Sequence, residues 1–398
     1  MKIAFMISSL TGGGAERVAI NLTHYFQEQL KDQVDCDLIV LNNIGDYSIE
    51  EAIFINERYS QNPFKKALFH FWLYPHKLRK IKKEKQYDAV ISFTPLPNRM
   101  NIKSNAGEKS IISVRNYTSL IHSQKVQNIL RKEYPRADKI IAVSEKCKED
   151  LQASLGLDPA LIKCIYNPYP ISTIIKEGAL SIPDEEAFLF ENKETIISIG
   201  RFSDQKAFWR IIKAVAVMKE TLPNIKLVLM GKEEGGSKNQ AFLELLVNRF
   251  RLESNVHFVG FKENPFAYIQ RSQVFVLCSQ YEGFPNALTE AMCLGVPVVS
   301  TDCLSGPREI LAPELDLSTS LDEIMKASSG ILVPQYPADE NREGITKNDK
   351  MLAASILELI QDEEMRKHYS EAAKQRAKDF EVGVIANQWI AEINELIK

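Results

Sequence analysis

The sequence predicts an α/β protein built from two doubly wound, Rossmann-like domains with a cleft between them. Short apolar runs alternate with amphipathic helical stretches, and this rhythm stops at one polar stretch and then begins again. The length of 398 residues agrees, because single cores seldom grow beyond about 250–300 residues. We place the domains at 1–170 and 171–382. A last helix over 383–398 is expected to cross back onto the first domain.

The first half begins with an apolar run over 2–8, a Gly-rich turn, and a helix over 16–30 whose apolar residues recur at helical spacing. Further short runs are almost continuously apolar, which is typical of parallel strands buried on both faces. These runs cover 36–41, 89–93, 110–114 and 139–143.

The rhythm resumes after a polar stretch over 168–192, which we interpret as the linker. Strands are expected over 195–199, 226–230, 256–258, 274–278 and 297–300, and helices over 207–221, 240–251, 286–293 and 384–397. Ligands of such sheets bind beyond the carboxyl ends of the strands, and the motifs described below fall there.

The bulk composition narrows the class of protein. Hydrophobic content of 45% and charged content of 25% argue against a disordered chain and an integral membrane protein. Lys and Arg number 24 against 18 Asp and Glu through residue 170, and 25 against 34 after it, so the first half is expected to meet an anionic partner. The six cysteines form no CxxC pair, which is typical of reduced thiols in a cytosolic protein and predicts no metal site.

A Gly-rich loop, Gly12-Gly13-Gly14, follows the first predicted strand and precedes a helix. Glycines let backbone N–H groups approach an anion at a helix N-terminus. The order of the glycines is not GxGxxG, which argues against a nicotinamide dinucleotide. A plain tight turn is an equally good interpretation of this loop by itself.

Two further loops carry charged residues. Arg201 and Lys206 follow Gly200 on a strand-to-helix loop, where two cations can converge on a diphosphate. Glu282 precedes the helix predicted over 286–293, and Glu290 lies in the first turns of that helix. A carboxylate on a helix can bind two vicinal ribose hydroxyls, and free N–H groups at its start can bind phosphate. In isolation, each of these side chains is more often a solvated or capping residue.

The stretch Glu-Gly-Phe-Pro-Asn-Ala-Leu-Thr-Glu over 282–290 resembles the signature of glycosyltransferase family 4, the glycosyl transferases group 1, whose members have the GT-B fold. The similarity is collinear over essentially the whole chain and includes the loops at 12–17, 200–206 and 330–334. It implies that Arg201 and Lys206 bind the diphosphate of a nucleotide-diphosphate sugar, Glu290 the ribose, and Glu282 the transferred sugar.

The resemblance also implies a mechanism and a donor site. Family members retain the anomeric configuration without a metal, by front-face attack in which the departing phosphate takes the proton of the acceptor. No cofactor is then expected beyond the nucleotide sugar. The segment 305–309 is similar to that of members that use uridine-diphosphate sugars, often N-acetylhexosamines. The implied donor-binding residues are Gly12, Gly13, Gly14, Gly200, Arg201, Lys206, Phe261, Glu282, Gly283, Phe284, Asn286, Ala287, Leu288 and Glu290.

One position departs from the family pattern. Many members carry a His close to the sugar after the fourth strand of the first domain, whereas this chain has Val114-Arg115-Asn116-Tyr117. Arg115 or Asn116 is the candidate for a contact to a sugar hydroxyl or phosphate, or to the acceptor.

The segment from Phe64 to Gln86 is basic and aromatic, with eight Lys and Arg and one acidic residue. Such a composition suits an interfacial segment on anionic lipid, although a helix packed on its own domain with solvated lysines has the same pattern. Family acceptors are often polyprenyl-diphosphate-linked saccharides. We therefore expect a cytoplasmic enzyme, peripheral on the inner face of the cell membrane, that extends a lipid-linked saccharide for a surface glycan or glycoprotein.

Other functions remain open at this point. The same chemistry on a protein or small-molecule acceptor and a sugar-nucleotide epimerase or phosphorylase on the same fold are enzymatic alternatives. A nucleotide-sugar-binding module is the non-enzymatic alternative. Nucleic acid is not expected as a partner, because the positive charge is local and no RNA-recognition motif accompanies it.

Overall fold

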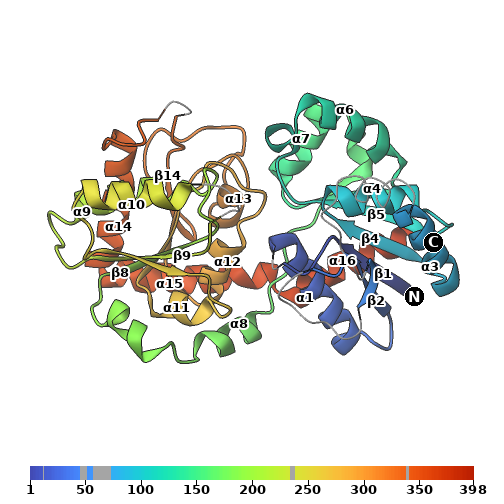
Figure 1. Cartoon of the computed structure of the whole chain (residues 1–398), viewed down its shortest axis with the longest axis horizontal. Coiled ribbons are helices and arrows are strands. Elements are labelled where there is room, and N and C mark those ends of the chain that lie inside the picture. Colours follow the sequence, from blue (N-terminus) through green and yellow to red (C-terminus); the bar gives the residue numbers. More distant parts are fainter. Residues whose placement is uncertain (12, 45–51, 57–72, 234–237, 338–339) are drawn as a thin grey trace. The chain divides into compact units, whose positions relative to one another are not determined.

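The structure is a computed structural model that describes residues 1–11, 13–44, 52–56, 73–233, 238–337 and 340–398. The chain divides into two compact units, unit 1 (Met1–Pro170 and Phe380–Lys398) and unit 2 (Ile171–Asp379). Within the described residues each unit contains a seven-stranded sheet flanked by helices (Figure 1). The predicted class of two parallel-sheet α/β domains is therefore confirmed.

The sheet of unit 1 has the strand order β3-β2-β1-β4-β5-β6-β7, and all of its paired strands are parallel. The two strands at its edges were not predicted; one has three residues, and the other has four, of which Ile53, Phe54 and Ile55 are apolar. The strands are β1 (Lys2–Ile7), β2 (Asp35–Asn42), β3 (Ile53–Asn56), β4 (Ala89–Phe93), β5 (Lys109–Val114), β6 (Lys139–Ala142) and β7 (Ile162–Cys164).

Side chains of β1 alternate between two buried faces of this sheet, as a strand with period two requires. Phe5 packs with residues of α1 and α16, and Met6 with residues of α3 and α4. The ring of Phe5 lies 6.4 Å from that of Trp389 on α16, so the last helix forms part of the core of unit 1. The helices are α1 (Gly14–Gln29), α3 (Tyr74–Lys85), α4 (Pro95–Lys103), α5 (Thr118–Ile121), α6 (Gln124–Glu133), α7 (Glu145–Leu155) and α16 (Val382–Ile397).

The sheet of unit 2 has the order β10-β9-β8-β11-β12-β14-β13, and only the edge strand β13 runs antiparallel among the described strands. Its strands are β8 (Thr195–Ile199), β9 (Lys226–Met230), β10 (Val256–Gly260), β11 (Val274–Leu277), β12 (Val298–Thr301), β13 (Met325–Ala327) and β14 (Gly330–Val333).

Helices α9, α10 and α14 cover one face of this second sheet through a single apolar cluster (Figure 1). The helices of unit 2 are α8 (Ile171–Gly178), α9 (Trp209–Met218), α10 (Asn239–Arg249), α11 (Phe266–Arg271), α12 (Asn286–Cys293), α13 (Pro307–Leu311), α14 (Lys347–Gln361) and α15 (Glu363–Ala377).

The polar stretch over 168–192 is structured, which differs from its interpretation as a linker. It contains α8 and a 3₁₀ segment, Asp184–Phe190, and both belong to unit 2. Its polar side chains bond to the body of the unit: Glu186 pairs with Lys262 at 2.6 Å and accepts a hydrogen bond from Tyr268. The polarity that resembled a linker thus reflects surface ion pairing.

The first part of the basic, aromatic segment, up to Trp72, lies outside the described residues. Its Phe64, Phe69, Phe71 and Trp72 are therefore not placed. The remainder begins α3, whose buried Lys82 forms an ion pair with Glu108 at 2.6 Å. Arg79, Lys80 and Lys83 are exposed on the same helix. Over the described ranges, none of the helices has the length and apolarity to cross a bilayer.

Candidate functional site

A lysine and a glutamate meet where two neighbouring strands of unit 2 end. Lys206 lies on the loop after β8, and Glu282 on the loop after β11, which pairs with β8. Lys206 Nζ is 2.6 Å from Glu282 Oε1, and the hydroxyl of Ser279 donates to the same oxygen at 2.6 Å. Because both donors converge on Oε1, Glu282 Oε2 receives no hydrogen bond from the described residues.

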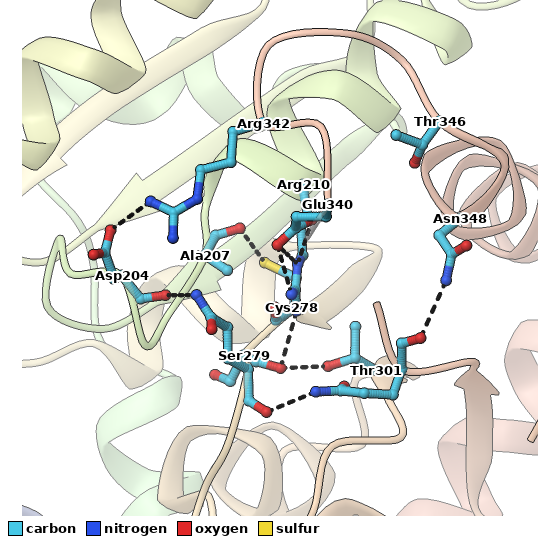
Figure 2. Close-up of polar contacts among 12 residues, drawn as sticks. Asp204, Ala207, Arg210, Cys278, Ser279, Thr301, Glu340, Arg342, Thr346 and Asn348 are labelled. Carbon is cyan, nitrogen blue, oxygen red and sulfur yellow. Dashed lines mark hydrogen bonds and ion pairs between the residues drawn. The ribbon is translucent and has the colours of Figure 1, made fainter. Parts of the chain in front are cut away.

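The two loops are tied to each other before any ligand arrives. Gln205 Nε2 donates to the carbonyl of Tyr281 at 2.9 Å, and the amide of Gln280 donates to the carbonyl of Gln205 at 2.8 Å. The side chain of Gln280 donates in addition to the carbonyl of Asp204 (Figure 2). Lys206 and Glu282 are therefore held in place by hydrogen bonds between their two loops as well as by their own ion pair.

Gly200 is needed for the position of the lysine. A Cβ at Gly200 would stand 2.9 Å from Lys206 Cε, so only glycine lets the lysine stem lie against the end of β8. Gly231, at the end of β9, has φ +152° and packs so closely that a Cβ would stand 1.8 Å from the carbonyl oxygen of Gly200. A side chain at either position would displace the lysine or the loop that carries it.

Helix α12 follows the Glu282 loop and places Glu290, which is 4% exposed, on its fifth residue. Asn286, Ala287 and Leu288 form its first turn, at the end of the helix where backbone amides can point towards a ligand. The predicted helix over 286–293 is confirmed. Gly283 and Phe284 are buried in the loop before it.

A second loop supports this segment from the end of β12. Ser305 Oγ donates to the carbonyl of Gly283 at 2.8 Å. Gly306 has φ +92°, and a Cβ there would stand 2.5 Å from Pro285 Cδ, so glycine allows the close contact. Arg308 forms an ion pair with Asp302, which holds the beginning of α13 to the end of the strand.

A buried arginine stabilises the end of β11 through hydrogen bonds. Arg210 Nη1 donates to the carbonyls of Cys278 at 2.9 Å and Ser279 at 3.3 Å, and the guanidinium pairs with Glu340 at 2.7 Å (Figure 2). Thr301 Oγ1 also donates to the carbonyl of Ser279, at 2.9 Å. These contacts fix the strand end from which the Glu282 loop departs.

Cys278 lies in this framework but is not a nucleophile. Burial raises the pKa of its thiol to about 12, so it is neutral near pH 7. The thiol contacts the carbonyl oxygen of Ala207 at 3.4 Å (Figure 2) and that of Lys206 at the same distance. Because the thiolate is the reactive form of cysteine, its role here is to hold the loop.

The remaining candidates of unit 2 are more exposed. Arg201 is exposed on the loop that carries Lys206. Phe261, directly after β10, is 51% exposed, and Lys232 Nζ lies 5.1 Å from the centre of its ring. Both therefore lie near strand ends of unit 2.

The Gly-rich loop of unit 1 is closed by a glutamate. Gly12 lies outside the described residues. The amide of Gly13 donates to Glu16 Oε2 at 3.1 Å, and Ser9 Oγ donates to Glu16 Oε1 at 2.6 Å. Gly14 is the first residue of α1. The carboxylate of Glu16 thus occupies the place at Gly13 where an anion was expected.

Arg115 and Asn116 follow β5 and line one cavity of unit 1 together with Thr94, Ser113 and Thr118. The cavity lies beyond the carboxyl ends of β4 and β5, as predicted for a ligand site of such a sheet.

Comparison with known proteins gives the family of the chain. Residues 12–172 match the model of Glycosyltransferase Family 4, and residues 183–376 that of Glycosyl transferases group 1. An uncharacterized glycosyltransferase of Methanocaldococcus jannaschii is 32% identical, over 87% of this chain and 88% of its own.

Two other similarities extend over nearly the whole chain. A Campylobacter jejuni N-acetylgalactosamine-N,N'-diacetylbacillosaminyl-diphospho-undecaprenol 4-alpha-N-acetylgalactosaminyltransferase is 29% identical over 97% of both chains. The crystal structure of HepE from Anabaena in complex with UDP superimposes with a TM-score of 0.77 at 19% identity, over 99% of this chain and 100% of that chain, so the two share the GT-B fold. The chain belongs to glycosyltransferase family 4 and is a glycosyltransferase.

Proposed function

We propose that this glycosyltransferase transfers a hexose or N-acetylhexosamine from a uridine-diphosphate sugar, with retention, to a lipid-linked saccharide. The observation that carries the donor side is the Lys206–Glu282 pair at the ends of β8 and β11, with Glu282 Oε2 left open. A cation beside an open carboxylate oxygen can bind a phosphate and a sugar hydroxyl of the same donor.

Each donor-side residue then has a distinct task. Lys206 and Arg201 neutralise the diphosphate, and backbone amides at the start of α12 contact its oxygens. Glu290 accepts hydrogen bonds from the ribose hydroxyls, and Glu282 accepts one from the transferred sugar. On binding of the donor, Lys206 shares its contact with Glu282 between the carboxylate and the phosphate.

The chemical step needs no protein base in this proposal. The bond between the anomeric carbon and the phosphate oxygen breaks, and the acceptor oxygen bonds to the same face of that carbon. The acceptor proton passes to the departing phosphate oxygen, whose negative charge Lys206 and Arg201 stabilise. Glu282 orients the sugar, and no metal takes part.

The Campylobacter relative supports a lipid-linked acceptor, because its name describes transfer to a diphospho-undecaprenol-linked saccharide. The exposed Arg79, Lys80 and Lys83 of α3 support a contact with anionic lipid, to which each basic residue contributes about 1 kcal/mol near the surface. We infer an enzyme bound peripherally to the inner face of the cell membrane.

The donor proposal is tested by incubating the protein with a panel of nucleotide sugars and following nucleotide release and product mass. Glu282→Ala and Lys206→Ala should each lower kcat about 100-fold or more, as loss of a group that stabilises the transition state does. Glu244→Ala, at an exposed position of α10, is the matched control and should retain full activity. Full activity of Glu282→Ala would refute the assignment.

The same assay separates the alternatives. Free sugar released without any acceptor points to a hydrolytic epimerase, and transfer to a protein or small molecule replaces the lipid acceptor. Binding of the nucleotide sugar without turnover of any donor points to a binding module. Proton coupling at the anomeric carbon of the product, measured by NMR, shows whether the configuration is retained.

Flotation with anionic vesicles tests the membrane contact. Replacing Arg79, Lys80 and Lys83 by Gln should weaken binding at low salt. The control replaces Lys125, Lys132 and Arg136, which are exposed elsewhere in unit 1 and change the charge equally. Equal binding of both triple variants contradicts a specific role of α3.

A further inference from the structure

The cavity of unit 1 beyond β4 and β5 has an unusual set of walls. Hydroxyl and amide side chains line it, together with the guanidinium of Arg115 and the imidazole of His122, whose pKa burial lowers, and none of the described residues around it is acidic. The residues that bear on the argument are Thr94, Asn98, Ser113, Arg115, Asn116 and Thr118.

Arg115 has no anionic partner among the described residues. Its Nη1 donates to Ser113 Oγ at 3.1 Å, and its guanidinium carbon lies 5.6 Å from the centre of the Phe93 ring. Its Nη2 is shielded from solvent and has no hydrogen-bond acceptor among them. Burial lowers the pKa of Arg115 to about 10, and the nearby Tyr169, Cys147 and Cys164 offset part of that effect.

The backbone at the same cavity is strained. Thr94 has φ +75° and ψ 159°, a backbone conformation that residues other than glycine rarely adopt. Its hydroxyl lies 3.2 Å from that of Ser8 at the end of β1. Pro95 and Pro97 begin α4 and lack an N–H group, so that helix offers few backbone donors to the cavity. The positive charge of the cavity therefore comes from Arg115.

We propose that this cavity is an anion subsite in which Arg115 binds the oxygens of a phosphate group. A guanidinium presents parallel N–H groups that match two phosphate oxygens, and no acidic residue among those that line the cavity competes for them. The hydroxyls of Thr94 and Thr118 and the amide of Asn116 are available for further oxygens. An unpaired, shielded cation is costly to fold, and binding of an anion offsets that cost.

During glycosyl transfer the phosphate would come from the diphosphate of the donor or from the phosphate of a lipid-linked acceptor. This assignment of the source rests on the proposed function, whereas the anion subsite itself does not. The tests below therefore begin with binding and end with turnover.

Binding is tested with inorganic pyrophosphate on the full chain in an Arg201→Ala/Lys206→Ala background, which removes both cations assigned to the donor diphosphate in unit 2. Pyrophosphate should raise the melting temperature of this background and of the same background with Arg115→Lys, because a ligand that binds only the folded state stabilises it. It should not raise that of the background with Arg115→Met. An equal rise in the Arg115→Met variant overturns the subsite.

The stability of the free protein separates a ligand-binding arginine from a structural one. Arg115→Met should raise the melting temperature without ligand, because it removes an unpaired cation. The control is Arg99→Met on α4, whose side chain pairs with Glu133 at 2.5 Å, and this change should lower the melting temperature. A fall of the same size in Arg115→Met contradicts the proposal.

Steady-state kinetics identify the source of the phosphate. Arg115→Met should raise one KM by roughly 10- to 100-fold, as loss of a charge-assisted hydrogen bond does. A rise for the acceptor, with unchanged KM for donor hydrolysis, assigns the acceptor phosphate, and a rise for the donor in both reactions assigns its diphosphate. Unchanged constants for both overturn the subsite. If wild-type protein transfers no sugar, the proposed function fails and pyrophosphate binding alone decides the subsite.

Discussion

Unit 2 and unit 1 each place cations at the carboxyl ends of neighbouring parallel strands, but the partners of those cations differ. In unit 2, Lys206 pairs with Glu282 at 2.6 Å, and Arg210 with Glu340 at 2.7 Å. In unit 1, Arg115 has one neutral hydroxyl as its hydrogen-bond partner among the described residues. The comparison shows two ways of keeping a cation ready for an anionic ligand.

The paired cations of unit 2 are stable without a ligand, because each charge is compensated where it is buried. The loops that carry them can be fixed in advance, as the contacts among Asp204, Gln205 and Gln280 show. Arg115, the cation of unit 1 without a carboxylate partner, reduces the stability of the free protein. It interacts more strongly with an anionic ligand because no carboxylate competes for it. In unit 2 the positive charges are neutralised by carboxylates when the protein folds. In unit 1 the charge of Arg115 is neutralised when an anionic ligand binds.

The largest effect is expected from removing the partner of the buried Arg210. Glu340→Gln would give unit 2 an unpaired arginine and should lower the free energy of unfolding by about 3–5 kcal/mol. Urea unfolding followed by tryptophan fluorescence measures the change. The double variant Arg210→Met/Glu340→Gln removes both charges and should recover part of the loss; a double variant less stable than Glu340→Gln contradicts this account.

A smaller effect of opposite sign is expected from giving Arg115 a partner. Asn116→Asp changes little in shape at the wall of the same cavity and should raise the free energy of unfolding by about 1 kcal/mol at pH 7. Arg115 would lower the pKa of the new carboxyl, so the gain is present above the ordinary pKa of Asp and is lost as pH falls through the lowered value. The variant should also lose the pyrophosphate response; a retained response would separate Asn116 from the subsite.

The smallest effect is expected at an exposed pair. Arg342 donates to Asp204 at 3.0 Å, with side chains 44% and 63% exposed (Figure 2). Asp204→Asn should therefore change the free energy of unfolding by less than about 1 kcal/mol. A loss as large as that of Glu340→Gln would show that exposure does not separate these pairs, and the comparison would then need another physical basis.

Much of the fold could be predicted because its strands are apolar on both faces. The runs at β1, β4, β5, β8 and β9 agree with the structure to within a residue or two at either end. The edge strands β3 and β7 were not predicted, because β7 has only three residues and the apolar run of β3 is too short to distinguish a strand from a helix segment. The stretch over 168–192 was misinterpreted because ion pairs such as Lys262–Glu186 are long-range in sequence and leave no local pattern.

The candidate site shows the same division. Lys206 and Glu282 could be named from their loops, and their mutual contact is shown by the structure alone. Ser279 had no signal beyond its place after a strand, and the segment 305–309 gave no sign that Ser305 bonds to the loop of Glu282. Arg210 looked like an ordinary helical residue, because its partner Glu340 is far away in the sequence. The unpaired state of Arg115 is likewise a property of its surroundings, which local sequence does not report.

Helix α16 has a consequence for how the protein is made. Trp389 on this helix packs between the rings of Phe5 and Phe93, which belong to strands near the beginning of the chain. A ribosome releases the residues of unit 2 before it reaches this tryptophan. The core of unit 1 therefore remains incomplete throughout synthesis of unit 2. It is completed only when α16 has been synthesised and packs against β1 and β4.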